Sequence, residues 1–238
     1  RVRGLFSDDV PLQSLRARLM DAGYPEPSID RVDDRDWENA WRQHVPPRRY
    51  GGRLWVLPSD AETGPEHGVC VRLDPGLAFG TGAHPTTALM LEWLDGNVEP
   101  GASLIDYGCG SGILAIAAAK LGAARVRAVD NDPMALQTAR DNARDNDCLD
   151  RITFHDPESV PREGADLLVS NIFADPLISL FASFEGLVRP RGRIALSGIL
   201  ADQLGAVAEV YAQGFELAPV LDRDRWILLS GRKRAAPA

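Results

Sequence analysis

The sequence predicts an α/β fold in which a mostly parallel sheet carries crossover helices and closes with an antiparallel hairpin. From Pro100 onward, short apolar segments alternate with longer segments of helical period, the pattern of repeated strand–helix–strand units. The first apolar segment runs straight into a glycine-rich turn. The last two are separated only by the polar stretch Asp222–Arg225, so their strands must run antiparallel.

The individual elements follow from apolar periodicity and from Gly and Pro breaks. Parallel strands are expected at Ser103–Tyr107, Arg125–Asp130, Ile152–His155, Leu167–Ser170 and Arg193–Ser197. Helices are expected at Gly112–Leu121, Pro133–Asp145, Asp175–Leu187 and Ala201–Gln213. The closing hairpin joins Phe215–Leu221 to Trp226–Ser230.

The part before Pro100 predicts a short α+β segment ahead of the parallel sheet. Leucines at helical spacing indicate a helix over Leu12–Met20, and Val2–Phe6 has the composition of a short strand. Trp37 and Trp41 lie four residues apart and would share one face of a short helix. Further strands are expected at Leu54–Leu57 and Val69–Leu73.

The composition is that of an ordinary globular protein. Of its 238 residues, 45% are hydrophobic and 25% are charged. A chain of this length can bury a core without disulfides or metal ions. The formal net charge of −8 argues against nucleic-acid binding, so no direct nucleic-acid partner is expected.

The cysteines, histidines and apolar runs exclude other classes. The 3 cysteines and 4 histidines lack the spacing of a disulfide framework or a zinc site, so no metal is expected. The longest apolar run, Ile113–Ala119, is too short for a membrane span, and the N-terminus does not resemble a signal peptide. We therefore expect a cytoplasmic protein without a membrane partner. The chain begins with Arg1 rather than methionine, as a fragment or a trimmed form would.

The strongest motif is LIDYGCGSGI at residues 104–113, where an apolar strand leads into a glycine-rich turn and then a helix. Such glycines let the backbone approach a ligand closely, although a plain strand-to-helix turn can look the same. Two carboxylates sharpen the interpretation. Asp106 precedes Gly108 and Gly110, and Asp130 ends the next strand, where a carboxylate can accept from both hydroxyls of a ribose. The motif predicts a nucleoside cofactor.

The glycine spacing indicates which cofactor this is. A dinucleotide-binding turn reads G-x-G-x-x-G and holds a pyrophosphate at the helix N-terminus. Here the spacing is G-x-G-x-G after Asp106, whose carboxylate is a poor neighbour for pyrophosphate but suits a cationic amino-acid group. We therefore expect S-adenosylmethionine and a class I methyltransferase fold: a Rossmann-like, mostly parallel seven-stranded sheet with an antiparallel terminal hairpin.

A second glycine-rich segment, LDPGLAFGTGAHPTT at residues 73–87, leads into a helix that begins at Pro85. Its glycines beside Phe79 and Thr81 fit a mobile flap over a ligand, although a linker between domains has a similar composition. His84 could act as a base, but a histidine in such a loop is more often a capping or packing residue.

Asn171 ends the fourth parallel strand, next to the glycine turn in a doubly wound sheet. Its amide oxygen can accept a hydrogen bond from a substrate amine, or the side chain can cap the following helix, and both roles are compatible. Asp156 and Glu158 follow the third strand at a common position for an adenine contact, but solvated loop acids are the simpler expectation.

Five ordered segments carry a resemblance to a known family: LDPGLAFGTGAHPTT, IDYGCGSGILAIAAAKLGA, AVDNDPMALQTARDNA, VSNIFADPL and LSGILADQ. Together they resemble the PrmA family, the bacterial methyltransferases of large-subunit ribosomal protein eleven, from about Gly4 to the C-terminus. The resemblance implies methyl transfer to lysine side chains and the N-terminal amine of that ribosomal protein. It also implies a partial substrate-recognition domain at residues 1–32, a linker at 33–58 and a methyltransferase domain at 59–238.

The site residues follow from the motifs and the resemblance together. Cofactor contacts are expected at Phe79, Thr81, Thr87, Asp106, Gly108, Gly110, Asp130 and Asn171. Asn171 is also the expected catalytic residue, because it would orient the amine. Many amine methyltransferases continue this asparagine with Pro-Pro-aromatic; here Ile-Phe-Ala follows, so the aromatic contact would come from Phe173 or Phe79.

Three alternatives remain open from the residues alone. One is a class I methyltransferase for another protein or a small molecule. Another is a cofactor-binding module without catalytic activity. The third, a nicotinamide-dependent oxidoreductase, is disfavoured by the glycine spacing and by Asp106.

Overall fold

The computed structural model describes residues 12–23, 47–59, 61, 64–73 and 84–235. The chain divides into two compact units, Arg1–Trp41 and Arg42–Ala238. Within the first unit, α1 (Leu12–Asp21) confirms the helix predicted from its leucine spacing. The predicted strand at Val2–Phe6 and the helix around Trp37 and Trp41 lie outside the described residues.

The second unit is built on an eight-stranded sheet. Its strands are β4 (Ser103–Tyr107), β5 (Arg125–Val129), β6 (Ile152–His155), β7 (Ala165–Asn171), β8 (Val188–Leu200), β9 (Phe215–Leu217), β10 (Leu221–Arg223) and β11 (Trp226–Lys233). The strand order is β10-β11-β8-β7-β4-β5-β6, with β9 also paired to β11. The five strands β4 to β8 run parallel, and β11 runs antiparallel to β8, β9 and β10.

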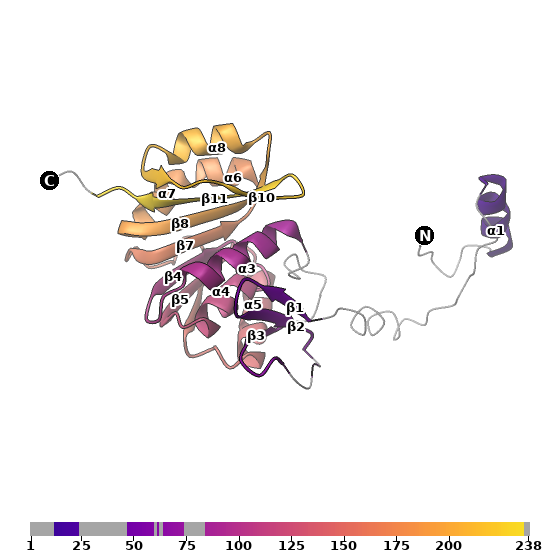
Figure 1. The fold of residues 1–238 in the computed structure, drawn as a ribbon, viewed down its shortest axis with the longest axis horizontal. Coiled ribbons are helices and arrows are strands. Elements are labelled where there is room, and N and C mark those ends of the chain that lie inside the picture. Colours follow the sequence, from indigo (N-terminus) through magenta and orange to yellow (C-terminus); the bar gives the residue numbers. More distant parts are fainter. Residues whose placement is uncertain (1–11, 24–46, 60, 62–63, 74–83, 236–238) are drawn as a thin grey trace. The chain divides into compact units, whose positions relative to one another are not determined.

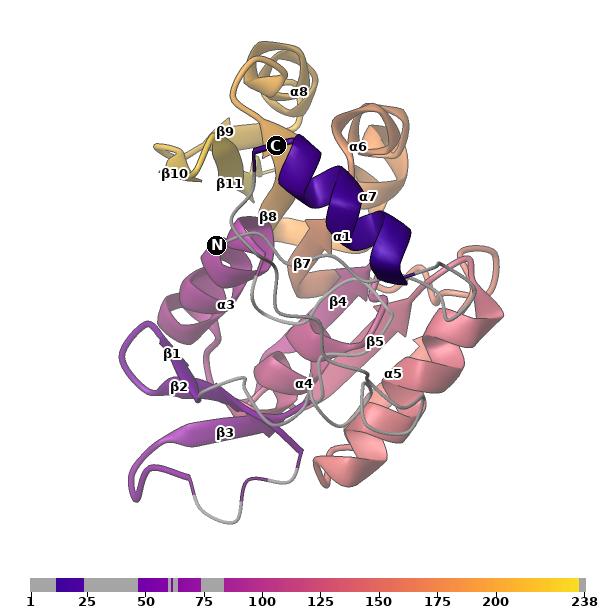
Figure 2. The same cartoon turned by 90° about the vertical axis from the view of Figure 1, so that its right-hand side faces the viewer.

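Helices cover both faces of this sheet (Figures 1 and 2). They are α3 (Pro85–Asn97), α4 (Ile113–Lys120), α5 (Pro133–Asp145), α6 (Ala174–Ser179), α7 (Phe181–Leu187) and α8 (Leu204–Tyr211). Figure 1 shows α3, α4 and α5 on one face and α6, α7 and α8 on the other. Each set of helices buries its own apolar cluster against the sheet. Among the helices of the described ranges, none combines the length and the apolar character needed to cross a membrane.

A small three-stranded sheet packs beside α3 and α4 (Figure 2). It comprises β1 (Arg48–Tyr50), β2 (Leu54–Leu57) and β3 (Val69–Arg72), with β1 antiparallel and β3 parallel to β2. Two polar side chains fasten it to the helices. The buried Asn146 accepts from the Arg72 N–H at 2.7 Å and donates to the Arg72 carbonyl at 2.6 Å. Asp95, near the end of α3, accepts from the Gly52 N–H at 2.6 Å.

The predicted fold class is confirmed, with two differences in detail. The sheet has eight strands rather than seven, because the expected strand Phe215–Leu221 is two short strands, β9 and β10, which pair with different parts of β11. The expected helix Asp175–Leu187 is also divided: α6 ends at Ser179, and Leu180 separates it from α7. The short strand β1 was not predicted.

The topology creates one switch point. Along the chain the sheet grows from β4 through β5 to β6, and β7 then returns to the other side of β4. Open α/β sheets bind ligands outside the carboxyl ends of their strands at such a point. In this protein the glycine turn after β4 and the end of β7 at Asn171 both lie there.

Candidate active site

The glycine turn after β4 adopts a backbone that requires glycine. Gly108, Gly110 and Gly112 have φ values of 78°, 51° and 77°, which side chains rarely adopt. A Cβ at Gly108 would lie only 2.5 Å from Ile172 Cγ2, so the turn and the segment after β7 are in close contact. The Gly108 N–H donates to the Val129 carbonyl at 2.7 Å, which fixes the turn against the end of β5. The turn is therefore held rigidly against both neighbouring strands.

Asp130 follows β5 and supports the same turn. One of its oxygens, Oδ2, accepts from the Gly110 N–H at 2.9 Å, and Oδ1 accepts from the Asp132 N–H at 3.0 Å. Asp132 in turn caps the N-terminus of α5 by accepting from the Met134 N–H at 2.9 Å. Each oxygen of a carboxylate has further acceptor capacity, so Asp130 can still receive donors from a ligand.

Asp106 on β4 is a buried carboxylate that is only half satisfied. Its side chain is 0% exposed, and Oδ2 accepts from the Ala115 N–H at 3.0 Å in the first turn of α4. The other oxygen, Oδ1, is buried and has no hydrogen-bond partner among the described residues. Burial raises the pKa of Asp106 to about 7, against the hydrogen bond from Ala115 and with a smaller contribution from the negative charge of Asp130. A bound cation would supply what this carboxylate lacks.

Asn171 stands at the end of β7 and contacts α3. Its Nδ2 donates to Thr87 Oγ1 at 3.4 Å, and Thr87 is buried. The amide oxygen is the atom of Asn171 that can accept from an amine. The helix that follows is capped by Phe173 without a side-chain hydrogen bond, so Asn171 is not its N-cap.

Gly198 on β8 packs against the segment that follows Asn171, a contact that was not predicted from the sequence. Its φ is 85°, and a Cβ there would overlap the Ile172 carbonyl oxygen. The absence of a side chain lets β8 approach the segment after Asn171 and supports it from behind. The only available signal was the glycine inside the LSGILADQ segment.

Six of the eight predicted cofactor contacts lie around the switch point: Asp106, Gly108, Gly110, Asp130, Thr87 and Asn171. The other two, Phe79 and Thr81, lie outside the described residues. Phe173, one of the two candidate aromatic contacts, is 69% exposed directly after the Asn171 segment.

His84 and Asp156 have structural roles in this fold. The Nδ1 atom of His84 caps α3 by accepting from the Thr86 N–H, and its ring packs edge-on against Trp226 at a centroid distance of 5.0 Å. Asp156 Oδ1 accepts from the N–H groups of Glu158 and Ser159, and hydrogen bonding from Ser159 holds the pKa of this exposed carboxyl below its usual value. Both residues therefore fit the simpler of the roles considered from the sequence.

The site as a whole fits S-adenosylmethionine. Asp106, one of whose oxygens has no partner among the described residues, lies on the strand that leads into the glycine turn, which suits a ligand that carries a positive charge. The turn lacks side chains at Gly108 and Gly110, which allows close approach of the backbone. The Asp130 carboxylate directly follows the neighbouring strand β5, where a ribose is commonly bound in doubly wound folds.

Comparison with known proteins agrees with this geometry. The family model described as "Ribosomal protein L11 methyltransferase (PrmA)" matches residues 1–234. A ribosomal protein L11 methyltransferase of Azotobacter vinelandii is 50% identical over 235 residues, which cover 97% of this chain and 80% of that protein. The protein of the same name from Hahella chejuensis is 48% identical over 235 residues, 98% of this chain and 80% of that protein.

A solved structure gives the same result. The crystal structure of a ribosomal protein L11 methylase from Lactobacillus delbrueckii subsp. bulgaricus superposes with a TM-score of 0.70 at 30% identity. The superposition covers 78% of this chain and 96% of the Lactobacillus chain. An O-methyltransferase from Bacillus cereus shares the fold with a TM-score of 0.53 at 15% identity. The chain belongs to the ribosomal protein L11 methyltransferase (PrmA) family.

Proposed function

We propose that this chain transfers methyl groups from S-adenosylmethionine to amino groups of ribosomal protein L11, namely lysine side chains and the N-terminal amine. The observation that carries the proposal is the convergence of the glycine turn, Asp130 and Asn171 at a single switch point, in a member of this family. The products would be the methylated protein and S-adenosylhomocysteine.

The bound cofactor supplies a methyl group on a positively charged sulfur, which an amine can take by direct displacement. In this chain, Asp130 and the turn at Gly108 and Gly110 would hold the nucleoside part. Asp106 would face the cationic amino-acid part, because its second oxygen has no partner among the described residues. No metal ligand is required by this assignment.

The substrate amine must also be neutral when it reacts. A lysine amine has an ordinary pKa of about 10.4, so it must lose its proton before it can act as a nucleophile. Exclusion of water around the amine favours the neutral form. Asn171 would then orient the nitrogen through its amide oxygen, while the contact of its Nδ2 with Thr87 holds the side chain in place. The enzyme's contribution is mainly positioning.

The proposal also bears on recognition and location. Residues 1–32 would contribute part of the surface that recognises the ribosomal protein, and residues 33–58 would link it to the methyltransferase domain at 59–238. A protein that acts on a ribosomal component would work in the cytoplasm.

The test is methyl transfer from labelled S-adenosylmethionine to purified L11, with mass spectrometry to locate the methylated amines. Asn171→Ala should lower kcat and kcat/KM together while cofactor affinity changes little, because an orienting contact acts mainly in the transition state. Asn97→Ala, at the other end of α3, is the matched control and should keep its turnover.

The outcomes separate the alternatives. Cofactor binding without any methylation of L11 would favour another protein or a small molecule as substrate. A loss of cofactor affinity alone in Asn171→Ala would make Asn171 a cofactor ligand and not the residue that orients the amine.

A further inference from the structure

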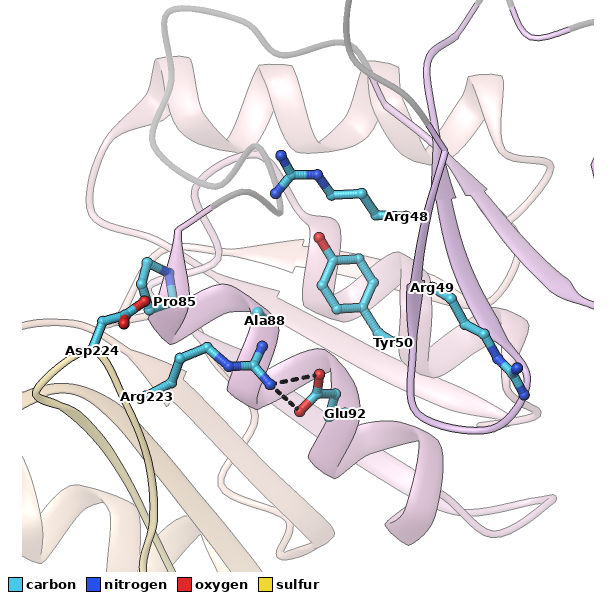
Figure 3. Close-up of a pocket in the computed structure, with 8 residues that line it drawn as sticks. All are labelled: Arg48, Arg49, Tyr50, Pro85, Ala88, Glu92, Arg223 and Asp224. Atoms are coloured by element: carbon cyan, nitrogen blue, oxygen red, sulfur yellow. Dashed lines mark hydrogen bonds and ion pairs between the residues drawn. The ribbon is translucent and has the colours of Figure 1, made fainter.

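A cavity of about 410 Å³ shares the helix α3 with the candidate active site and has no role in the function proposed above. It is lined by three regions that are far apart in the sequence: β1, the stretch of α3 from Pro85 to Glu92, and the end of β10 with the turn that follows it (Figure 3). Its size is within the range of small-ligand pockets, about 300–1,000 Å³. It is large enough for one side chain of a bound polypeptide.

The lining of this cavity is polar and rich in hydrogen-bond donors. Arg48 and Tyr50 enter from β1, and Figure 3 shows the Tyr50 hydroxyl pointing toward the Arg48 guanidinium. Burial raises the pKa of Tyr50, although Arg48 opposes this through its charge and a hydrogen bond, so the hydroxyl keeps its proton at neutral pH. Arg49 turns away and donates to the carbonyl of Gly52.

The opposite wall carries a fixed arginine. Arg223 Nη2 lies 3.0 Å from both carboxylate oxygens of Glu92, which holds the guanidinium in one orientation. The Glu92 carboxylate is engaged by this pair and is a poor site for an incoming cation. The remaining N–H groups of Arg223 are available as donors, because a guanidinium has five. Asp224, at the turn, is the one lining carboxylate that no described ion pair engages.

The cavity and the amine-orienting residue share one helix. Pro85 and Ala88 line the cavity, while Thr87, between them in sequence, faces Asn171. A helix is about 10 Å in diameter, so a polypeptide that passes around it from one face to the other follows a path of about 15 Å, which about five extended residues span. A substrate segment whose amine reaches Asn171 can therefore place a neighbouring side chain in the cavity.

We propose that this cavity is a specificity subsite that binds a carboxylate side chain of the substrate polypeptide, within a few residues of the amine that is methylated. The inference rests on the proposed function, because it assumes a polypeptide substrate at Asn171. Arg48 and Tyr50 would donate to the carboxylate, and Arg223 would face it from the other wall. A planar guanidinium donates charge-assisted hydrogen bonds in a geometry that a carboxylate can accept.

The experiment compares Arg48→Gln, Arg48→Lys and Asp224→Asn with the wild type on purified L11. Arg48→Gln should raise KM for L11 about fivefold, with kcat and the affinity for S-adenosylhomocysteine unchanged, because a partly exposed pair is worth less than a buried one. Arg48→Lys keeps the charge and should recover part of the loss. Asp224→Asn should leave KM unchanged or lower it, because it removes a negative charge beside the carboxylate.

A second substrate identifies the partner group. L11 in which the Asp and Glu residues next to the methylated amines are replaced by Asn and Gln should show the same rise in KM with the wild type. With Arg48→Gln it should show no further rise, which is the signature of two groups in contact.

Other results would overturn the subsite. One is an unchanged KM for L11 in Arg48→Gln. Another is that the enzyme and substrate changes raise KM additively. A third is a KM that rises in Asp224→Asn, which would indicate a cationic occupant. Calorimetric binding of L11 in the presence of S-adenosylhomocysteine separates the two proposals. L11 that is neither bound nor methylated by the wild type overturns the proposed function and the subsite with it. L11 that is methylated with equal KM by Arg48→Gln overturns the subsite alone.

Discussion

Replacing Asp106 with asparagine should change how the stability of the cofactor-free protein depends on pH. The carboxyl is fully buried, and its pKa is about 7 in the folded protein against 3.8 in the unfolded chain. Between about pH 4 and 7 the folded state therefore keeps a proton that the unfolded chain has released. Stability falls as pH rises wherever the folded state binds more protons, so Asp106 should destabilise the fold progressively across this window.

The magnitude follows from the size of the shift. A rise of about three pKa units at 1.36 kcal/mol per unit corresponds to about 4 kcal/mol above pH 7 and to nothing below about pH 4. The asparagine variant would have no such dependence, since an amide does not titrate in this range. Its amide oxygen can still accept from the Ala115 N–H, so the contact with α4 is retained.

The assay is urea unfolding of the wild type and of Asp106→Asn at intervals from pH 4.5 to 8.5, without cofactor. The stability of the variant relative to the wild type should increase by a few kcal/mol across the series. Saturating S-adenosylhomocysteine should flatten the wild-type dependence, because its ammonium would favour the ionised carboxylate. A difference between the two proteins that stays constant with pH would refute the reasoning, since burial would then not perturb Asp106.

Three further predictions concern the glycine turn, Asp130 and the contact of Asp166 on β7 with Ser103 on β4. Gly108→Ala should lower the free energy of unfolding by about 1–3 kcal/mol, because Gly108 has a positive φ and its Cβ position meets Ile172. The control Gly96→Ala, in open space on α3, should raise the free energy of unfolding by up to about 1 kcal/mol in the same thermal unfolding assay. Equal changes in the two variants would contradict this prediction. Asp130→Ala should weaken S-adenosylmethionine binding at least about tenfold by calorimetry, since each charge-assisted hydrogen bond is worth about 1.5–3 kcal/mol. The circular dichroism spectrum should stay unchanged. An unchanged affinity would remove Asp130 from the site. Burial acts to raise the pKa of Asp166, but Ser103 hydrogen bonds and the Arg189 charge outweigh it and the pKa is lowered. Asp166→Asn should therefore cost stability in urea at pH 7 and progressively less as pH falls below 4; a cost independent of pH would exclude the linkage.

Much of the fold could be predicted because its signals are local. The bounds of β4 and α5 agree with the sequence analysis, since an apolar run ends at glycine in the first case and Asp132 with Pro133 starts the helix in the second. The short strands are different. A segment such as β1 or β9 has only three residues, and its strand character comes from the partner it pairs with, which periodicity does not reveal.

The candidate site divides in the same way. The glycines and Asp130 were found because they directly follow strands whose ends meet at one edge. The half-satisfied state of Asp106, by contrast, depends on what surrounds it in three dimensions. The cavity beside α3 could not be predicted from the sequence, because Arg48, Glu92 and Arg223 come from three separate regions of the sequence and no short motif contains them.

The position of β11 has a consequence for how the protein is made. This strand lies between β8 on one side and β9 and β10 on the other, and its Trp226 packs against His84 at the start of α3. Synthesis proceeds from the N-terminus, so the glycine turn and Asn171 are complete while β8 is still an open, apolar edge. A nascent chain that has not yet released β11 from the ribosome carries the whole cofactor motif but lacks one wall of the neighbouring cavity. The complete sheet and the cavity should therefore form only after translation has passed β11, and chains arrested earlier would be candidates for aggregation through β8.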